Sequence, residues 1–449
     1  MKIGTWLDRI SSSLKSKDNL VPIIIVIMVI SILIDSQIGY IADFIPEYLS
    51  STAGVMLFVS LIVFLVLSSF FMIYYVKRIE DLAVAKYIHF KLIYYFVLAA
   101  QSLITLMLIF TVLQILIFQE YDTVSLFVIH IISYGIWIGV LGLLARAFVL
   151  WYKNFNRNSM ILIFALAMIA YVLNGVFGLI YASDTLTQQN SIVSLGDVAY
   201  FPEFSIESIG SQIDLIYTGC SVVAFILTWI GSVKLLYRYI RRIGKFKFWT
   251  IMIVSLIYYN IEFPLFALGY FDPVDDANAL LNILIFSFGG ILAGIIFGIS
   301  FLSIARTLKI NSVVRNQLIL TAYGFLLFYI TGSAVAAQAA YPPFGLISVS
   351  LIGLSCYLIY SGLYSSAQIV SQDVILLKSI KNSVTEQANF LGGIGTAHRN
   401  KELESRVLTI AKDLENEIEE ASGVQSSLDE TEMVDYIQYV VNEIHKNKE

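Results

Sequence analysis

Long runs of apolar residues, separated by short polar segments, set the pattern of this chain. A helix needs about 20 mostly apolar residues to cross a bilayer, whereas the elements of a soluble core alternate apolar and polar positions. Runs of the required length fall at residues 20–43, 53–76, 92–118, 124–151, 159–182, 213–236, 248–270, 280–304, 318–340 and 344–369. The pattern predicts an all-α polytopic bundle of about ten transmembrane helices within residues 20–370.

The two ends of the chain are more polar than this bundle. Residues 1–19 are predicted to be a cytoplasmic segment, and their spacing suits an interfacial helix as well as an irregular leader. Residues 371–449 are predicted to be a short cytoplasmic helical tail, with apolar positions every three or four residues from Leu403 to Ile418. We expect one helix continuing from the last span, a hinge at the glycines 392, 393 and 395, and two shorter helices after it.

The basic residues orient the bundle. All 28 Lys and Arg residues lie in the N-terminal segment, in the tail, or at the turns after the second, fourth, sixth and eighth runs, where Arg146 and Lys234 fall near the ends of the runs 124–151 and 213–236. The segments after the odd-numbered runs contain none. Cytoplasmic loops keep Lys and Arg, whereas translocated loops lose them. The pattern therefore predicts a multi-pass protein of the cell membrane with both chain ends in the cytoplasm.

Composition agrees with this class and argues against others. The chain is 58% hydrophobic and 14% charged, whereas roughly 25% of residues are charged in soluble domains. Cys220 and Cys356 both lie in apolar runs, so we expect neither a disulfide nor a metal site. Motifs of nucleotide-binding proteins, zinc proteases and serine hydrolases are absent from the sequence. We predict no enzymatic activity, no cofactor and no nucleic-acid partner.

Ionisable side chains inside the apolar runs are the main candidates for a site. Each costs roughly 2.5 to 3.5 kcal/mol at the centre of a spanning helix and so needs a reason to be there. The candidates are Asp35, His130, Asp214 and Glu262, with Asn260 as a polar neighbour. All are predicted in the outer half of the membrane, where no Lys or Arg accompanies them. If they converge, they form an acid-rich pocket open to the outside; otherwise each is an interfacial or hydrogen-bonded group.

Glu262 is the sharpest of these candidates because Pro264 follows it. A proline removes a backbone donor and loosens the helix one turn earlier. Broken helices that carry a carboxylate are common at transport and sensing sites. The sequence therefore predicts a helix break at Pro264 and a ligand- or cation-binding role for Glu262, with an interfacial, purely structural carboxylate as the alternative.

Glycines spaced by four residues predict close helix packing. Gly290, Gly294 and Gly298 lie on one face of the eighth run, and Gly135 with Gly139 gives a weaker version in the fourth. Such spacing lets another helix approach closely. We favour contacts within the bundle over contacts between protomers.

His398 lies in the tail and is followed by charged residues. This segment has some likeness to the phosphoacceptor helix of histidine kinases. However, the proline expected close to the histidine in that helix is missing here, and so is an ATP-binding domain. We expect a solvated surface histidine.

The last span and the tail resemble a known group of proteins. The likeness is carried by Leu376, Lys378, Ser379, Ile380 and Lys381, by Gly395, Thr396, Ala397 and His398, and by residues 406–412. This part, less than a quarter of the chain, is similar to uncharacterised multi-pass membrane proteins of ammonia-oxidising archaea. The resemblance implies a location in an archaeal-type cell membrane. It implies no mechanism, because that family has no assigned activity.

Two functions suit these observations. The bundle is interpreted as a membrane sensor or signal-transducing module, with an outward polar pocket as input and the cytoplasmic tail as output. The alternative is a secondary transporter of a small neutral or cationic solute, since five spans plus five would suit an inverted repeat. The expected partners are the lipid bilayer and, through the tail, a cytoplasmic protein or a second copy. The long tail favours the first function, because transport does not require it.

Overall fold

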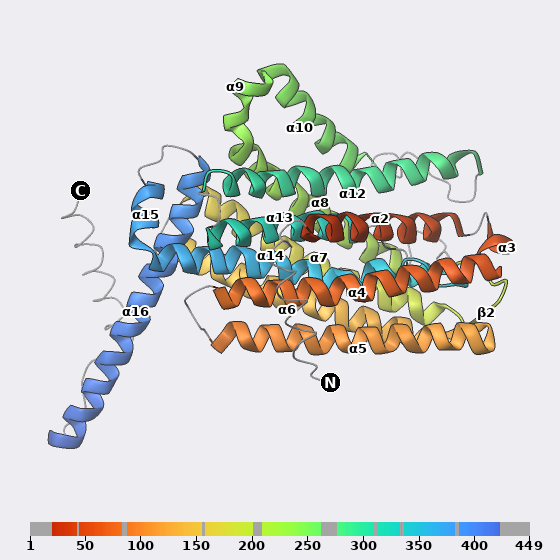
Figure 1. Ribbon diagram of the computed structural model, residues 1–449, viewed down its shortest axis with the longest axis horizontal. Helices are drawn as coiled ribbons and strands as arrows, with labels where there is room; N and C mark the ends of the chain where they lie inside the picture. The colour runs from red at the N-terminus through yellow and green to blue at the C-terminus, as the bar shows by residue number, and fades with distance from the viewer. Residues whose placement is uncertain are drawn as a thin grey trace, which may run out of the picture.

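The computed structural model describes residues 20–42, 45–82, 88–154, 158–200, 209–261, 276–308, 312–332, 334, 336–381 and 386–422. Long helices dominate this part of the chain, and most run side by side along the long axis of the molecule (Figure 1). They are α2 (Leu20–Ile41), α4 (Thr52–Leu82), α5 (Ile88–Phe118), α6 (Thr123–Asn154), α7 (Ser159–Gln188), α8 (Ile209–Leu236), α10 (Lys245–Asn260), α12 (Asp276–Ala305), α13 (Val313–Thr331), α14 (Leu346–Gln372), α15 (Val374–Lys381) and α16 (Glu386–Ser422).

Short elements connect these helices. They are α3 (Pro46–Leu49), α9 (Ile240–Ile243), the 3-10 turns η3 (Tyr237–Tyr239) and η4 (Ala336–Gln338), and the strands β1 (Glu120–Asp122) and β2 (Ile192–Ser194). β1 and β2 pair antiparallel with Tyr121 opposite Val193. The buried Tyr121 hydroxyl donates a 2.9 Å hydrogen bond to the carbonyl of Ala339. This small sheet joins the segment after α5 to the segment after α7. Both lie at the end of the bundle that is predicted to face outward.

Eight helices are long and apolar enough to cross a membrane. They are Leu20–Ile41, Thr52–Asp81, Phe90–Phe118, Thr123–Lys153, Ser159–Gln188, Gln212–Ile243, Val313–Gln338 and Leu346–Gln372. The chain is therefore an all-α, membrane-embedded helical bundle. Two predicted runs are not among the eight: the apolar helix described in the eighth run, Gly289–Ala305, is shorter, and α10 in the seventh ends at Asn260. The total of ten and the cytoplasmic position of the ends stay predictions.

α14 forms the centre of the bundle. It packs against α2, α4, α5, α6, α13 and α16, and its most apolar stretch is buried along its whole length. Serines and glycines recur along α14. The hydrophobic effect does not drive helices together in lipid, so they associate through close packing, which such small residues allow. A Cβ atom added at Gly324 of α13 would lie 2.7 Å from the backbone nitrogen of Ile359 on α14. A helix buried on every side has no lipid face of its own.

The glycine stripe of α12 packs against α13. Added Cβ atoms would lie 2.6 Å from the carbonyl oxygen of Tyr329 at Gly290, 2.9 Å from that of Leu326 at Gly294, and 3.0 Å from that of Ala322 at Gly298. Only glycine fits such a distance between the two backbones. Gly135 and Gly139 have the same spacing, but Cβ atoms added there would meet no atom of a neighbouring element within 4 Å.

The tail differs from its prediction in two ways. α14 does not continue into it, because Asp373 breaks the helix: its carboxylate accepts a 2.9 Å hydrogen bond from the backbone N–H of Leu376 and caps α15 instead. The predicted glycine hinge is wrong, since α16 runs unbroken through Gly392, Gly393 and Gly395. Residues 1–19 and the part of the tail after Ser422 lie outside the described residues.

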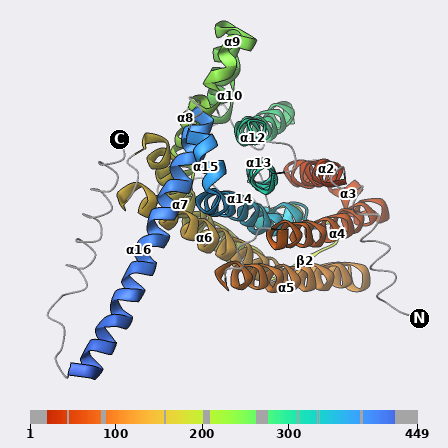
Figure 2. The same ribbon diagram turned by 60° about the vertical axis from the view of Figure 1, so that its left-hand side comes forward.

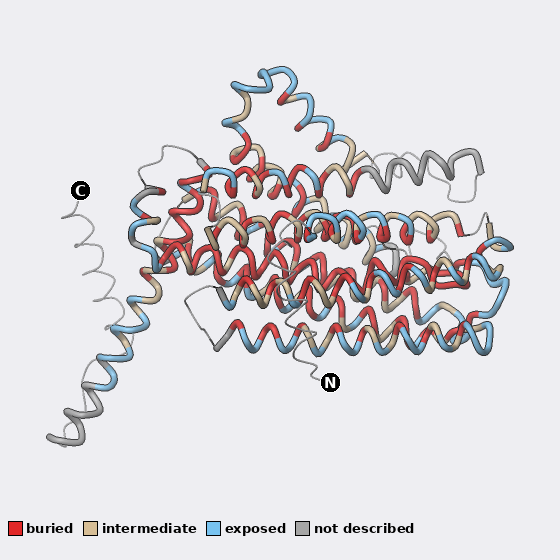
Figure 3. Tube along the Cα trace, in the orientation of Figure 1, coloured by how far each residue is buried: buried red, intermediate tan, exposed pale blue. Residues whose placement is uncertain are grey.

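α16 lies across one end of the bundle and then projects from it (Figures 1 and 2). Its first part is buried against α6, α7, α8, α12, α14 and α15, while residues 403–410 are mostly exposed (Figure 3). The contacts with α6, α8 and α14 fall near the C-terminal ends of these helices, at Trp151, Leu235 and Val370. This end of the bundle is the one that the basic residues predict to be cytoplasmic.

Candidate functional site

Asp35, predicted to line an outward pocket, is a helix cap. Its fully buried carboxylate accepts 2.9 Å hydrogen bonds from the backbone N–H groups of Gly345 and Ser348 and from the Ser348 hydroxyl. These N–H groups belong to the first turn of α14, which has no side-chain cap of its own at Gly345. The free N–H groups and the dipole at a helix N-terminus favour a carboxylate. Asp35 therefore joins α2 to the central helix.

The other predicted site residues lie apart from Asp35. His130 is buried on α6, where its Nδ1 donates a 2.8 Å hydrogen bond to the carbonyl of Leu126 and its ring stacks on Tyr134. Asp214 is half-buried on α8, close enough to Tyr181 to interact electrostatically. None of these three side chains contacts another within the part of the chain that the structure describes.

Asn260 is the last residue of α10. Its amide nitrogen donates a 2.6 Å hydrogen bond to the carbonyl of Leu256, and its amide oxygen is buried without a hydrogen-bond partner among the described residues. Glu262 and Pro264 lie outside the described residues. The described helix thus ends two positions before Glu262, while the break at Pro264 and the outward pocket stay predictions.

A buried hydroxyl network crosses the bundle. The Tyr171 hydroxyl on α7 hydrogen-bonds to Tyr329 on α13 and, at 2.8 Å, to Thr228 on α8. Tyr259 on α10 stacks on Phe225 with 4.0 Å between the ring centroids and hydrogen-bonds to Ser221 at 2.9 Å. Sequence analysis missed this network, although tyrosines in the middle of the runs 159–182 and 318–340 were a signal for it. Its buried hydroxyls connect α7, α8 and α13. α10 joins it through the ring contacts of Tyr259 with Phe225 and Tyr329.

The N-terminal half of α16 is anchored in the end of the bundle by polar and apolar contacts. Gln387 donates a 2.6 Å hydrogen bond to the carbonyl of Leu235 at the end of α8. Phe390 packs on Phe164 of α7 with 5.1 Å between ring centroids. A Cβ atom added at Gly395 would lie 2.9 Å from Cβ of Val370 on α14. We call this contact region, where residues 387–398 of α16 meet α6, α7, α8 and α14, the docking site.

His398 lies inside the docking site, so its predicted solvated position is wrong. The side chain is 8% exposed, and its ring packs edge-on against Trp151 at 5.9 Å and Tyr364 at 5.4 Å. Its Nδ1 is buried without a hydrogen-bond partner among the described residues. The charged residues that follow His398 concealed a buried helical face that also includes Gln387, Leu391 and Ile394.

Burial determines the charge of His398. Removal from water lowers the pKa of its imidazole to about 4, with a further lowering by Lys401 and an opposing effect of Glu402. The same environment lowers the pKa of Lys401, through burial first and then through the nearby Arg146. His398 is therefore neutral in the docked helix at pH 7.

Docking of α16 should weaken in acid. An exposed histidine has a pKa of about 6.5, so the undocked helix binds more protons than the docked one. Docking is then at full strength above about pH 6.5 and is lost progressively as the pH falls towards 4. Limited proteolysis of the full-length protein at Lys401 and Arg406 should therefore speed up between pH 7.5 and pH 5. His398→Phe keeps an aromatic ring in place, and its proteolysis rate should lose most of this pH dependence; an unchanged profile would contradict the assignment.

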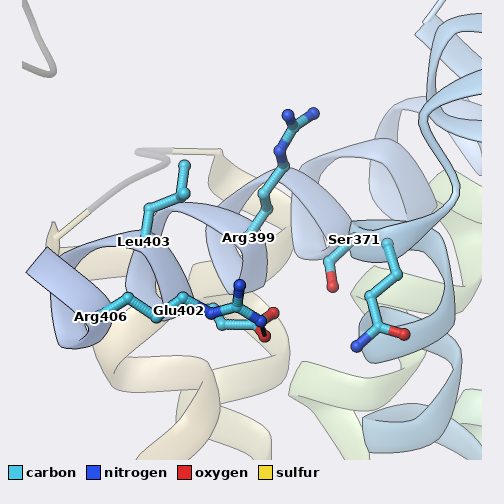
Figure 4. Close-up of a pocket in the computed structure, with 6 residues that line it drawn as sticks. Ser371, Arg399, Glu402, Leu403 and Arg406 are labelled. Atoms are coloured by element: carbon cyan, nitrogen blue, oxygen red, sulfur yellow. Dashed lines mark hydrogen bonds and ion pairs between the residues drawn. The ribbon is translucent and has the colours of Figure 1, made fainter.

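A shallow hollow of about 240 Å³ borders the docking site where α14 ends against α16. Ser371 and Gln372 line one side, and Arg399, Glu402, Leu403 and Arg406 line the other. Glu402 and Arg406 form a 2.8 Å ion pair, whereas Arg399 points away from them (Figure 4). The ion pair lines the hollow and joins one turn of α16 to the next.

Clusters of side chains that could bind a metal ion are absent from the described residues. The chain matches no protein-family model, no curated protein and no solved structure. The bundle and the docking site define a polytopic α-helical membrane protein whose tail helix packs into one end of its membrane domain.

Proposed function

We propose that this protein is a signal-transducing module of the cell membrane, in which rearrangement of the bundle changes the position of α16. The observation that carries the proposal is the docking site. α16 contacts the ends of α6, α8 and α14 at once, so a shift of any of these helices changes the surface on which α16 rests. A tail helix that is packed into the bundle can report on the arrangement of the bundle.

The exposed half of α16 is the proposed output. Leu403, Val407 and Ile410 are exposed at helical spacing and form one apolar stripe. Such a stripe, flanked by charges, suits a helical groove on a cytoplasmic partner or the same stripe on a second copy. Because the helix is continuous from Glu386 to Ser422, motion at the docking site moves the stripe as a rigid arm.

The proposed input lies in the outer half of the bundle. Glu262, predicted next to a helix break, follows the end of α10, and Tyr259 on α10 is stacked into the buried hydroxyl network. A ligand or proton that acts on this region is linked to α7, α8 and α13 through the rings of Tyr259 and Tyr329 and the hydroxyls of the network. α7 and α8 also contact α16.

Secondary transport is less well supported. Alternating access requires one group of helices to rock against another around a central site. Here the central helix is buried along its length, and α12 and α13 lie so close that Cβ atoms added at the glycines of α12 would meet backbone carbonyls of α13. Both features favour a bundle that moves in small steps over one that opens alternately to both sides.

The position of α16 tests the proposal. Spin labels at Ser405 and Lys153, in a Cys220→Ser background of the full-length protein in lipid nanodiscs, report the distance between α16 and the bundle. Tyr329→Phe removes a hydroxyl of the buried network and should shift this distance distribution. Tyr95→Phe, on the exposed face of α5, is the matched control and should not.

An α16 position that responds to no change in the network would contradict a signalling role. Uptake of a small neutral or cationic solute into proteoliposomes, abolished by Glu262→Gln, would support the transporter instead.

A further inference from the structure

The connection between α8 and α10 projects sideways from the bundle. η3, α9 and the first turn of α10 make up residues 237–247, which we call the basic elbow. Figure 1 shows α9 and α10 standing away from the long axis of the bundle, and Figure 2 shows the same from a second direction. Gly244 makes the turn between them with a φ of 92°, a conformation that favours glycine. The elbow is also mostly exposed (Figure 3).

The basic elbow is strongly cationic and has no acidic residue near it in sequence. Its cations are Arg238, Arg241, Arg242, Lys245 and Lys247, and all five are exposed. The chain contains no Asp or Glu between Asp214 and Glu262. None of the five cations forms an ion pair with another described residue. The elbow therefore presents a cluster of positive charge without a counterion in the part of the chain that the structure describes.

Large apolar side chains lie among these cations. Phe246 is 84% exposed, and Tyr237 and Ile243 are exposed as well. Exposing large apolar side chains to water does not stabilise a loop. Cations that alternate with apolar side chains instead suit the boundary between lipid headgroups and acyl chains. α10 continues this character beyond the elbow, with Ile251, Val254 and Ile257 exposed.

We propose that the basic elbow is a binding site for anionic membrane lipids. The arginines and lysines would contact the phosphates of the headgroups, and Phe246 would enter the acyl layer beside them. The sideways projection supports lipid as the occupant, because it extends the elbow into the space that the bilayer fills around a spanning bundle. The proposal is independent of a signalling or transport role.

Lipid retention by the purified full-length protein tests the site. The protein is equilibrated with phosphatidylglycerol or with phosphatidylcholine of equal chain length, and bound lipid is counted by native mass spectrometry. The parent should retain phosphatidylglycerol in preference to phosphatidylcholine. Arg238→Ala with Arg241→Ala and Arg242→Ala should weaken phosphatidylglycerol binding by about tenfold or more, because each cation near a lipid surface adds to the attraction. Phe246→Ala should weaken the binding of both lipids.

A matched control separates the site from net charge. Lys91→Ala with Lys153→Ala and Arg306→Ala removes three exposed cations from other turns on the side predicted to be cytoplasmic and should leave phosphatidylglycerol binding unchanged. An equal loss in this control would overturn the proposal, since any cation would then serve. Displacement of the lipid by millimolar inorganic phosphate would also overturn it, because it would reveal a free-phosphate site without a role for the apolar side chains.

Discussion

Asp35→Ala should lower the free energy of unfolding by about 3 kcal/mol, because it leaves buried N–H groups without a partner. The carboxylate accepts hydrogen bonds from Gly345, from the backbone of Ser348 and from the Ser348 hydroxyl. Removing it takes away the cap of the central helix together with the link from α2 to α14. Thermal unfolding in detergent, followed by size-exclusion chromatography, measures the loss.

Three further variants define the role of Asp35. Asp35→Asn keeps one acceptor oxygen and should lie between the parent and Asp35→Ala. Ser348→Ala removes the hydroxyl but leaves the N–H bonds, so it should cost only about 1 kcal/mol. Asp214→Ala is the matched control, because this half-buried carboxylate forms no hydrogen bond with described residues, and its stability should stay near that of the parent. If Asp35→Ala is as stable as the parent yet changes a ligand response, Asp35 belongs to a binding site instead.

That the chain is a membrane protein, and where most of its spans lie, could be predicted from the sequence. The length of an apolar run depends only on residues that are neighbours in the chain. Each candidate span overlaps one predicted run, and the lysines and arginines lie near the ends of those runs, in the segments between them or at the chain ends. The role of Asp35 could not be predicted in the same way. Its partners, Gly345 and Ser348, are more than 300 positions away in sequence, so only the packing of α2 against α14 brings them together.

The glycines show the same limit. Gly290 and Gly294 share their four-residue spacing with Gly135 and Gly139, but only the first pair meets another backbone. The spacing of glycines shows that another helix could pack closely on that face. It does not show whether a neighbouring helix lies there. His398 was misplaced for a related reason: Arg399 and Lys401 indicate a solvated segment, although the helical face that contains His398 is buried.

Gly395→Val should release α16 from the bundle. A side chain at this position meets Val370 of α14, whose Cβ lies 2.9 Å and whose carbonyl carbon lies 3.4 Å from an added Cβ. Val370 is fully buried and cannot move aside at low cost. We expect proteolysis at Lys401 and Arg406 to accelerate by about tenfold, the distance between labels at Ser405 and Lys153 to change, and thermal unfolding of the bundle to shift much less than in Asp35→Ala.

Two matched variants show whether this contact itself is responsible. Gly392→Ala places its Cβ 3.1 Å from the Cγ2 methyl of Ile380 on α15 and meets no atom of α14 within 4 Å, so α16 should stay docked. In the double variant Val370→Ala with Gly395→Val, the smaller side chain at 370 makes room for the valine at 395. This variant should regain part of the protection from protease. If α16 stays protected in Gly395→Val alone, the docking site does not control its position, and α16 cannot serve as an output that the bundle moves through this contact.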